Sequence, residues 1–272
     1  MASRGLSVAL DRGDIGGGTS FNNLKTLHGG LRSLQALNFP QMRRFIRERR
    51  ALARIAPHLI RPLSFIVPTS GLGKRSRMAM RAALAVNDLV ARDRDEGIAD
   101  PALHLPNGRV VSREDALRLN PYVDPDGVSG GAVWYDYQMT RADRVTFAFA
   151  ASAADRGAVV ANHVEAGGFL SAQGRITGAR LHDRLEGTAL DVQARVVVNA
   201  AGAWRPISSR RLAAVAAPCR PRRLSRAMNL VLDLRRRMGG GVVEGRFLFL
   251  VLWRGCRCSA RVTTSTTAAP MR

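Results

Sequence analysis

A chain of 272 residues with 46% hydrophobic side chains can bury a substantial core, which excludes a protein that is disordered throughout. Its 42 basic and 21 acidic residues give a net charge of +21, which by itself would suggest nucleic acid or an anionic membrane surface as a partner. Residues 205–272 hold fifteen of the arginines against only Asp233 and Glu244, so the excess lies mainly there and does not indicate a nucleic-acid surface along residues 1–204.

The first predicted element is a buried strand, "RGLSVALD" at residues 4–11, which ends in an acid and is followed at once by the turn-rich "RGDIGGGTS". This order is typical of the second strand of a dinucleotide-binding unit, in which the acid binds ribose hydroxyls about 20 residues after a glycine fingerprint. Asp11 lies too close to Met1 for that, so we expect the first strand and its glycine turn to precede residue 1. An ordinary turn role for Asp11 is the alternative.

The next segment, "TSFNNLKTLHGGLRSLQ" at residues 19–35, places a lysine, a histidine, two adjacent glycines and an arginine close together. Adjacent glycines let a backbone approach a ligand closely, and the basic side chains would favour a phosphate group. An ordinary loop that runs into a helix has the same composition. Both interpretations stay open on these residues alone.

Three helices are predicted between residues 40 and 119. The first spans 40–56, where Pro40 suits an early helical position and the apolar residues fall mostly on one side, so its arginines are interpreted as a solvated face. The second spans 77–92, and the third spans 112–119, where Ser112 and Asp115 have capping-box spacing. Together these helices predict a helical insertion.

A second α/β stretch is predicted from residue 140 onward. "TRAD" at 140–143 opens a helix that runs to Gly157, and the strand "AVVAN" follows. Residues 176–194 alternate as a hairpin does, and "ARVVVNAAGAW" at 194–204 predicts a β-branched strand that enters a small-residue turn. A turn without bulky side chains can approach a ligand closely.

The C-terminal part loses its regularity by degrees. "RLSRAMNLVLDL" and "GRFLFLVLWRG" predict strands, whereas residues 256–272 show no periodicity and predict a disordered end. The three cysteines, Cys219, Cys256 and Cys258, give no disulfide framework, which favours a reducing, cytosolic setting. The longest apolar run, "FLFLVLW", is far shorter than the roughly 20 residues of a membrane helix.

Five segments in this order and spacing resemble the FAD-dependent glycerol-3-phosphate dehydrogenases, within the broader family of flavin oxidoreductases that includes D-amino-acid oxidase. The segments are "RGLSVALDRGDIGGGTS", "LKTLHGGLRSLQ", "RIAPHLIRPLSFIVP", "WYDYQMTRADRVTFAFAASAADRGAVV" and "VVVNAAGAW". They cover about residues 4–204. The histidine-glycine-glycine-x-arginine segment joined to "APHLIRP" is fairly specific to the dehydrogenases, whereas the strand-acid and the Ala-Gly turn are shared by many flavoproteins.

The resemblance implies roles for particular residues. Asp11 would hold the adenosine ribose, a backbone contact at Val164 would reach the adenine, and the turn at Gly202 would pack against FAD. The residues implied to line the pyrophosphate and the flavin ring are Thr19, Ser20, Lys25, His28 and Gly29. Arg32 would bind the substrate phosphate in bidentate fashion, and His28 would have a direct chemical role. Tyr135 and Asp136 are interpreted as a structural corner, and no metal site is expected.

The implied fold is α/β: an incomplete Rossmann-like FAD-binding domain from residues 1–55 and 140–204, with the helical insertion at 56–139. Residues 205–255 would be the remnant of a β-rich substrate domain, and 256–272 a disordered tail. That tail, and with it 205–222, is hypothesised to come from a shifted reading frame in a GC-rich gene.

The implied reaction is oxidation of sn-glycerol 3-phosphate to dihydroxyacetone phosphate, with electrons passing through FAD to quinone. The expected location is the cytoplasm, either in solution or in peripheral contact with the inner face of the cell membrane. Three alternatives stay open: another FAD-dependent oxidoreductase acting on an amino acid or a 2-hydroxy acid, a non-functional gene fragment, and a basic nucleic-acid-binding protein. The last lacks interleaved aromatic and basic residues, so no nucleic-acid partner is expected.

Overall fold

A computed structural model describes Gly5 and residues 8–204, 226–233, 239–243, 246–253 and 257–264. The chain divides into two compact units, each described separately below. The first unit comprises Met1–Phe21, Thr146–Arg226 and Ser265–Arg272, and the second comprises Asn22–Val145 and Ala227–Thr264.

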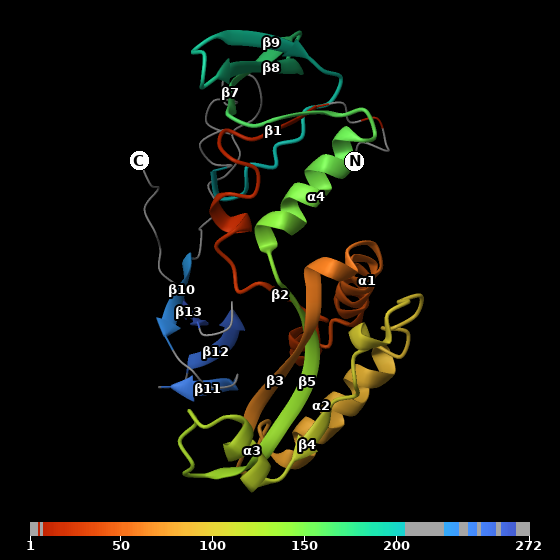
Figure 1. Ribbon diagram of the computed structural model, residues 1–272, viewed down its shortest axis with the longest axis vertical. Coiled ribbons are helices and arrows are strands. Elements are labelled where there is room, and N and C mark those ends of the chain that lie inside the picture. The colour runs from red at the N-terminus through yellow and green to blue at the C-terminus, as the bar shows by residue number, and fades with distance from the viewer. Residues whose placement is uncertain are drawn as a thin grey trace. The chain divides into compact units, whose positions relative to one another are not determined.

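The first unit contains two small sheets (Figure 1). Strand β1 (Val8–Leu10) pairs in parallel with β6 (Val159–Ala161), so both of these predicted strands form. The first was predicted to be buried, whereas all three residues of β1 are exposed. The other sheet is an antiparallel meander of β7 (Val164–Ala172), β8 (Arg175–Asp183) and β9 (Ala189–Gln193). Strands β8 and β9 confirm the predicted hairpin. Two short 3-10 turns, η2 (Gly18–Ser20) and η6 (Gly202–Trp204), also belong to this unit.

The second unit is built around one long antiparallel pair, β3 (Ile60–Ser70) and β5 (Val128–Met139). The short strands β2 (Thr26–Leu27) and β4 (Arg109–Val111) both pair with β5. A separate antiparallel sheet has the order β10-β13-β12-β11, with bounds Arg226–Asp233, Arg257–Thr264, Arg246–Trp253 and Gly239–Val243. Figure 1 shows helices α1 and α2 on one side of the β3–β5 pair and this second sheet on the other.

The helices begin where their capping residues predict. Helix α1 (Phe39–Ile55) begins after Asn38, whose side chain accepts the Gln41 amide, and α2 (Arg77–Val90) begins after Ser76. Helix α3 (Arg113–Leu119) begins after Ser112, whose hydroxyl accepts the Asp115 amide at 3.0 Å. Helix α4 (Ala142–Ala154) follows the predicted capping signal and continues into the first unit. Short 3-10 turns lie between these elements: η3 (Leu31–Ala36), η4 (Pro57–Leu59) and η5 (Pro101–Leu103).

The main core of the second unit lies where α1 and the 98–105 loop meet β5. Its members include Tyr137 and Ile60, and a neighbouring cluster packs Leu63 and Phe65 against Leu24 and Val251. Burial of apolar side chains of this size is worth about 1.5–3 kcal/mol each. The β3–β5 pair is therefore well packed, and the side chains that these two strands carry are held in defined positions.

Three sequence expectations are corrected by the structure. Segment 56–139 was expected to be a helical insertion and does hold α2 and α3, but its central feature is the antiparallel pair of β3 and β5. These two strands are separated by nearly sixty residues, and a local sequence pattern cannot reveal a pairing over that distance. Residues 194–200 form no strand: the Ala194 amide still donates to Thr177 O of β8 at 2.8 Å, but the pairing ends there, and Val196 and Val198 are exposed. Residues 257–264 form a strand rather than a disordered end, because β12 offers them a free edge. The assignment of the domains to cofactor and substrate stays a prediction.

Candidate functional site

In the first unit the structure brings Asp11 and Val164 together. The Asp11 amide donates to Ala161 O at 3.0 Å, and the Asp11 carbonyl accepts the Val164 amide at 3.0 Å. The Asp11 carboxylate is exposed and uses Oδ1 to accept the Gly13 amide at 3.1 Å. This contact is the turn role considered as the alternative. It uses one of the two carboxylate oxygens, and a carboxylate can accept further hydrogen bonds, for example from a sugar.

The turn that holds Thr19 and Ser20 lies against the turn that holds Gly202. A Cβ added to Gly18 would stand 3.1 Å from Cη2 of Trp204, so the absence of a side chain at Gly18 permits this close approach. Gly18 and Gly202 have φ of +59° and +55°, a region in which other residues are strained. Two exposed turns therefore lie next to each other in this unit, with the Trp204 ring packed against Gly18.

The remaining predicted site residues lie in the second unit, on the segment that contains β2 and η3. Lys25 has φ of +60°, its carbonyl accepts the Met139 amide at 2.7 Å, and its amide donates to the Asn23 side chain at 2.7 Å. The residue is 7% exposed, so Lys25 is not a surface lysine. Arg32 lies on η3 and is exposed, with its guanidinium in solvent as ligand recognition would require.

Asp136 on β5 organises this segment. Its Oδ1 accepts the Gly29 amide at 2.7 Å and Nη1 of Arg49 at 2.5 Å, and its Oδ2 lies 3.2 Å from Nδ1 of His28. The side chains of Asp136 and Arg49 are only 5% and 6% exposed, whereas that of His28 is 54% exposed. A buried carboxylate with a charged partner and two further contacts avoids the cost of an unpaired charge. We call Asp136, Arg49, His28 and the Gly29 amide the Asp136 cluster.

The two adjacent glycines are both required by this packing. A Cβ at Gly29 would collide with the Arg49 guanidinium, and a Cβ at Gly30 would stand 3.0 Å from Cδ2 of Phe45. Gly30 also has φ of +84°, in the left-handed region that favours glycine. The glycine pair is therefore explained by the close approach of helix α1 before any ligand is considered.

Tyr137, the next residue along β5, belongs to the core below the cluster. Its hydroxyl donates to the carbonyl of Leu103, and the Arg49 guanidinium carbon lies 5.9 Å from its ring centroid. Burial raises the pKa of Tyr137 to about 12, and the negative charge of Asp95 adds to the effect. The tyrosine is thus a neutral structural residue at ordinary pH.

Arg49 was missed as a site residue because every arginine of helix α1 was interpreted as solvated. Its position gives the signal that could have found it: Met42, Ile46, Arg49 and Ala53 follow the three- and four-residue steps of one helix face. The other three are buried apolar residues, so Arg49 is a charge within the apolar stripe. Such a charge is buried and needs a partner, which here is Asp136.

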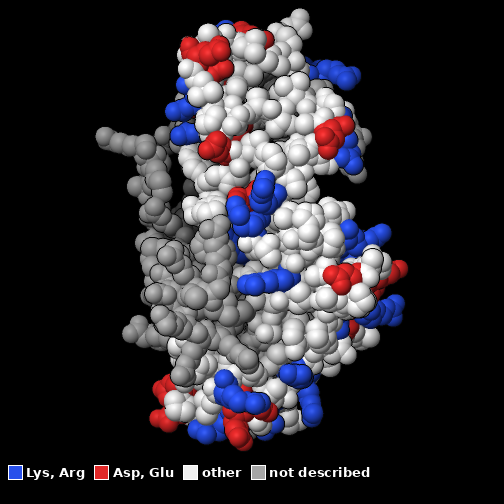
Figure 2. Space-filling view, viewed as in Figure 1, with Lys and Arg blue, Asp and Glu red and all other residues white. Residues whose placement is uncertain are grey.

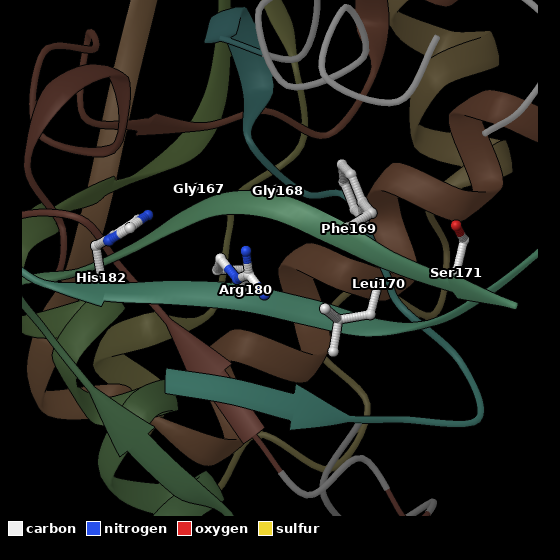
Figure 3. Close-up of a pocket in the computed structure, with 7 residues that line it drawn as sticks. All are labelled: Gly167, Gly168, Phe169, Leu170, Ser171, Arg180 and His182. Atoms are coloured by element: carbon white, nitrogen blue, oxygen red, sulfur yellow. The ribbon is translucent and has the colours of Figure 1, made fainter. Parts of the chain in front are cut away.

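A separate hollow of about 390 Å³ lies on the β7–β8 hairpin (Figure 3). It is lined by Gly167, Gly168, Phe169, Leu170, Ser171, Arg180 and His182. Arg180 already forms two hydrogen bonds of 2.8 Å to the carboxylate of Asp191. None of the predicted site residues lines the hollow, so it is not the site that the sequence predicts.

The charged side chains on the face shown in Figure 2 are mixed in sign. Basic and acidic residues alternate over its described surface, and no single broad basic patch is visible there. Many of the described arginines are paired with acids, such as Arg43 with Asp93 and Arg184 with Glu165. In the described part of the chain, no helix has the length and hydropathy that crossing a bilayer demands.

Comparison with known proteins supplies the family context. The family described as FAD dependent oxidoreductase matches residues 1–256. Glycerol-3-phosphate dehydrogenase of Mycobacterium leprae is 36% identical over 205 residues, which are 75% of this chain and 33% of the relative. The Synechocystis protein of the same name is 30% identical over 207 residues, 75% of this chain and 36% of the relative. The chain thus spans about a third of the length of these relatives.

Solved structures share the fold. A glycerol-3-phosphate dehydrogenase from Bacillus halodurans complexed with FAD superimposes with a TM-score of 0.69 at 22% identity, over 98% of this chain and 45% of that one. L-proline dehydrogenase from P. horikoshii gives a TM-score of 0.61 at 14% identity, over 95% of this chain and 64% of that one. At these identities the likeness concerns the fold alone.

Proposed function

The chain belongs to the FAD-dependent oxidoreductase family, and from this membership we propose that it is part of a glycerol-3-phosphate dehydrogenase. The proposed reaction oxidises the C2 hydroxyl of sn-glycerol 3-phosphate to the ketone of dihydroxyacetone phosphate. Electrons then leave to a quinone, for which we propose peripheral contact with the membrane. FAD, when bound, supplies the oxidant that accepts the hydride.

One observation carries this choice of substrate within the family. The relatives at 30–36% identity over about three quarters of the chain are named glycerol-3-phosphate dehydrogenase, whereas the proline dehydrogenase and glycine oxidase structures resemble it at 14–17% identity. The alternative of an amino-acid oxidoreductase therefore rests on the fold alone. A shared fold carries many substrates, so sequence identity is the stronger guide.

The residues of the first unit fit the adenosine end of FAD. Asp11 presents an exposed carboxylate at the end of a parallel strand, where the ribose hydroxyls of a dinucleotide are commonly bound. The Val164 amide already donates to the Asp11 carbonyl, so the Val164 carbonyl is the backbone group that could form a hydrogen bond with adenine. Thr19, Ser20 and Gly202 lie on neighbouring turns, and at Gly202 nothing lies within 4 Å of the position of a Cβ, so a ligand could approach the backbone there.

The residues of the second unit fit the flavin and the substrate. Lys25 and Gly29 lie on the segment held against β5, and we propose that they line the flavin ring. Arg32 is exposed, and its planar guanidinium group can bind a phosphate dianion through two hydrogen bonds. His28 is anchored at Nδ1 and open to solvent elsewhere, which suits a group that accepts the proton of a substrate hydroxyl.

The cofactor part of the proposal is tested by titrating the purified chain with FAD and following flavin fluorescence. We expect saturable binding that weakens roughly tenfold or more in Asp11→Ala, because two ribose hydrogen bonds are lost. Asp14→Ala is the matched control, since Asp14 is an exposed acid of the same loop that pairs with His163. Equal affinity in both variants would remove Asp11 from the site.

The substrate part is tested by adding candidate substrates to the flavin-loaded protein without oxygen. We expect sn-glycerol 3-phosphate to bleach the flavin absorbance, and glycine, proline and lactate to leave it unchanged. Arg32→Ala should raise the KM for glycerol 3-phosphate by roughly 10²-fold, because a charged hydrogen-bond pair is lost. Bleaching by an amino acid instead would favour the rival oxidoreductase.

A further inference from the structure

The Asp136 cluster contains a buried acid that faces the exposed His28. The Asp136 Oδ2 atom lies 3.2 Å from Nδ1 of the imidazole, and the side chain of Asp136 is 5% exposed. An ionised carboxylate can only accept hydrogen bonds, so the neutral imidazole must carry its proton on Nδ1 to bond with it. The other ring nitrogen, Nε2, then has a free lone pair.

The remaining contacts hold this arrangement in place. Asp136 Oδ1 accepts both the Gly29 amide and Arg49 Nη1, and the guanidinium charge balances that of the carboxylate. On its other side the imidazole faces Phe65 with ring centroids 6.1 Å apart, and Phe65 in turn stacks on Trp134 at 5.3 Å. The acid therefore cannot rotate without breaking two buried hydrogen bonds.

We infer that Asp136 is a positioning residue for the reaction: it holds His28 as the Nδ1–H tautomer, so that Nε2 can accept the proton of the substrate hydroxyl. This inference rests on the proposed function. When a secondary alcohol is oxidised, the C–H bond breaks and its electron pair leaves with the hydrogen as hydride to the flavin. The O–H bond breaks and its proton passes to Nε2, while the C=O bond forms. Asp136 would act through His28, because its side chain is only 5% exposed and its hydrogen bonds go to His28, Gly29 and Arg49.

The contacts of Asp136 predict a specific effect of the substitution Asp136→Asn. Two N–H donors converge on the Oδ1 position, so the amide oxygen of the asparagine has to take that place. Its NH₂ group then faces Nδ1 of His28, which can only accept from it. The imidazole must shift its proton to Nε2, and the lone pair that would accept the substrate proton is lost.

The decisive measurement is the tautomer of His28 by long-range proton–nitrogen NMR of the ¹⁵N-histidine-labelled full chain at about pH 9, where free histidine is neutral. The chain has five histidines, and the spectrum of His28→Gln identifies the signal. We expect Nδ1–H in the unsubstituted protein and Nε2–H in Asp136→Asn. In the loaded enzyme, kcat for glycerol 3-phosphate should fall by about 10²–10⁴-fold while KM stays near its original value.

Asp93→Asn is the matched control. Asp93 is also a carboxylate paired with arginines of helix α1, Arg43 and Arg50, but it lies outside the Asp136 cluster. We expect Asp93→Asn to leave both the His28 tautomer and kcat unchanged. If it shifts the tautomer as Asp136→Asn does, the effect is a general response to a lost ion pair and the inference fails.

The remaining outcomes are also distinct. An Nε2–H tautomer in the unsubstituted protein overturns the inference, and this result needs no variant and so holds even if Asp136→Asn fails to fold. An unchanged tautomer or an unchanged kcat in folded Asp136→Asn overturns it as well and reduces Asp136 to a structural corner. The expected tautomers without any oxidation of glycerol 3-phosphate support the positioning of His28 and overturn the proposed function alone.

Discussion

The two units differ in how they hold their candidate site residues. In the second unit, Lys25 and the Asp136 cluster are fixed by buried hydrogen bonds and packed against core residues such as Phe65. In the first unit, Asp11 directly follows the three-residue strand pair β1–β6, whose apolar side chains Val8 and Val159 are 42% and 63% exposed. Among the described residues of that unit, the buried apolar side chains are Ala158 and Leu181.

This difference shows which candidate site residues are held in place by the packing of the protein alone. A parallel sheet normally has both faces covered, and β1–β6 does not reach that burial among the described residues. The candidate residues of the second unit rest on a core, whereas those of the first unit rest on backbone hydrogen bonds at an exposed edge. We therefore expect the second unit to resist substitution and unfolding more strongly, and the following changes test this.

The largest effect is expected from Arg49→Met in the second unit. The change removes the charged partner of Asp136 and leaves a buried, uncompensated carboxylate, at a cost of about 3–5 kcal/mol in the free energy of unfolding. Urea denaturation followed by circular dichroism measures it. Arg47→Met on the exposed face of the same helix is the control and should cost less than about 0.5 kcal/mol. Similar losses in both variants would mean that the Asp136 pair contributes nothing to stability.

A smaller effect separates the apolar residues of the two units. Leu63 is 3% exposed, so Leu63→Ala should leave a cavity and cost about 2–4 kcal/mol. Leu10 on β1 is 37% exposed, so Leu10→Ala should cost about 1 kcal/mol or less. The same denaturation measurement compares the two variants. Equal costs would contradict the contrast in burial between the units.

The smallest effect concerns the acid limit of the second unit. A hydrogen bond from Arg43 holds the pKa of Asp93 well below its usual range, with Arg50 adding a further charge. A lowered pKa stabilises the folded state above the unfolded pKa of about 3.9, and this stabilisation is lost as the pH falls below that value.

Asp93→Asn should therefore lower the free energy of unfolding at pH 7 by about 1 kcal/mol and flatten its decline below pH 4. Unfolding midpoints measured between pH 7 and pH 3 give both quantities. If the variant loses stability with acid as steeply as the original protein, Asp93 is not the group that titrates.

Much of the local structure could be predicted because its causes are local. Asn38, Ser76 and Ser112 cap the helices that follow them, and alternation over residues 176–194 correctly predicted β8 and β9. The strand expected at 194–204 is absent, because a strand depends on a neighbour with which it can exchange hydrogen bonds. For the same reason β13 forms at 257–264, where the composition predicted disorder.

The amino-acid sequence by itself determined the α/β class, the family resemblance and the segments that hold the candidate residues Asp11, Lys25, His28 and Arg32. Only the tertiary structure decided that Asp136 and Arg49 meet beneath His28, because these partners lie 108 and 87 residues apart along the chain. A buried charge finds its partner only when two distant elements pack together, here β5 against α1. Local periodicity does not indicate which elements these will be.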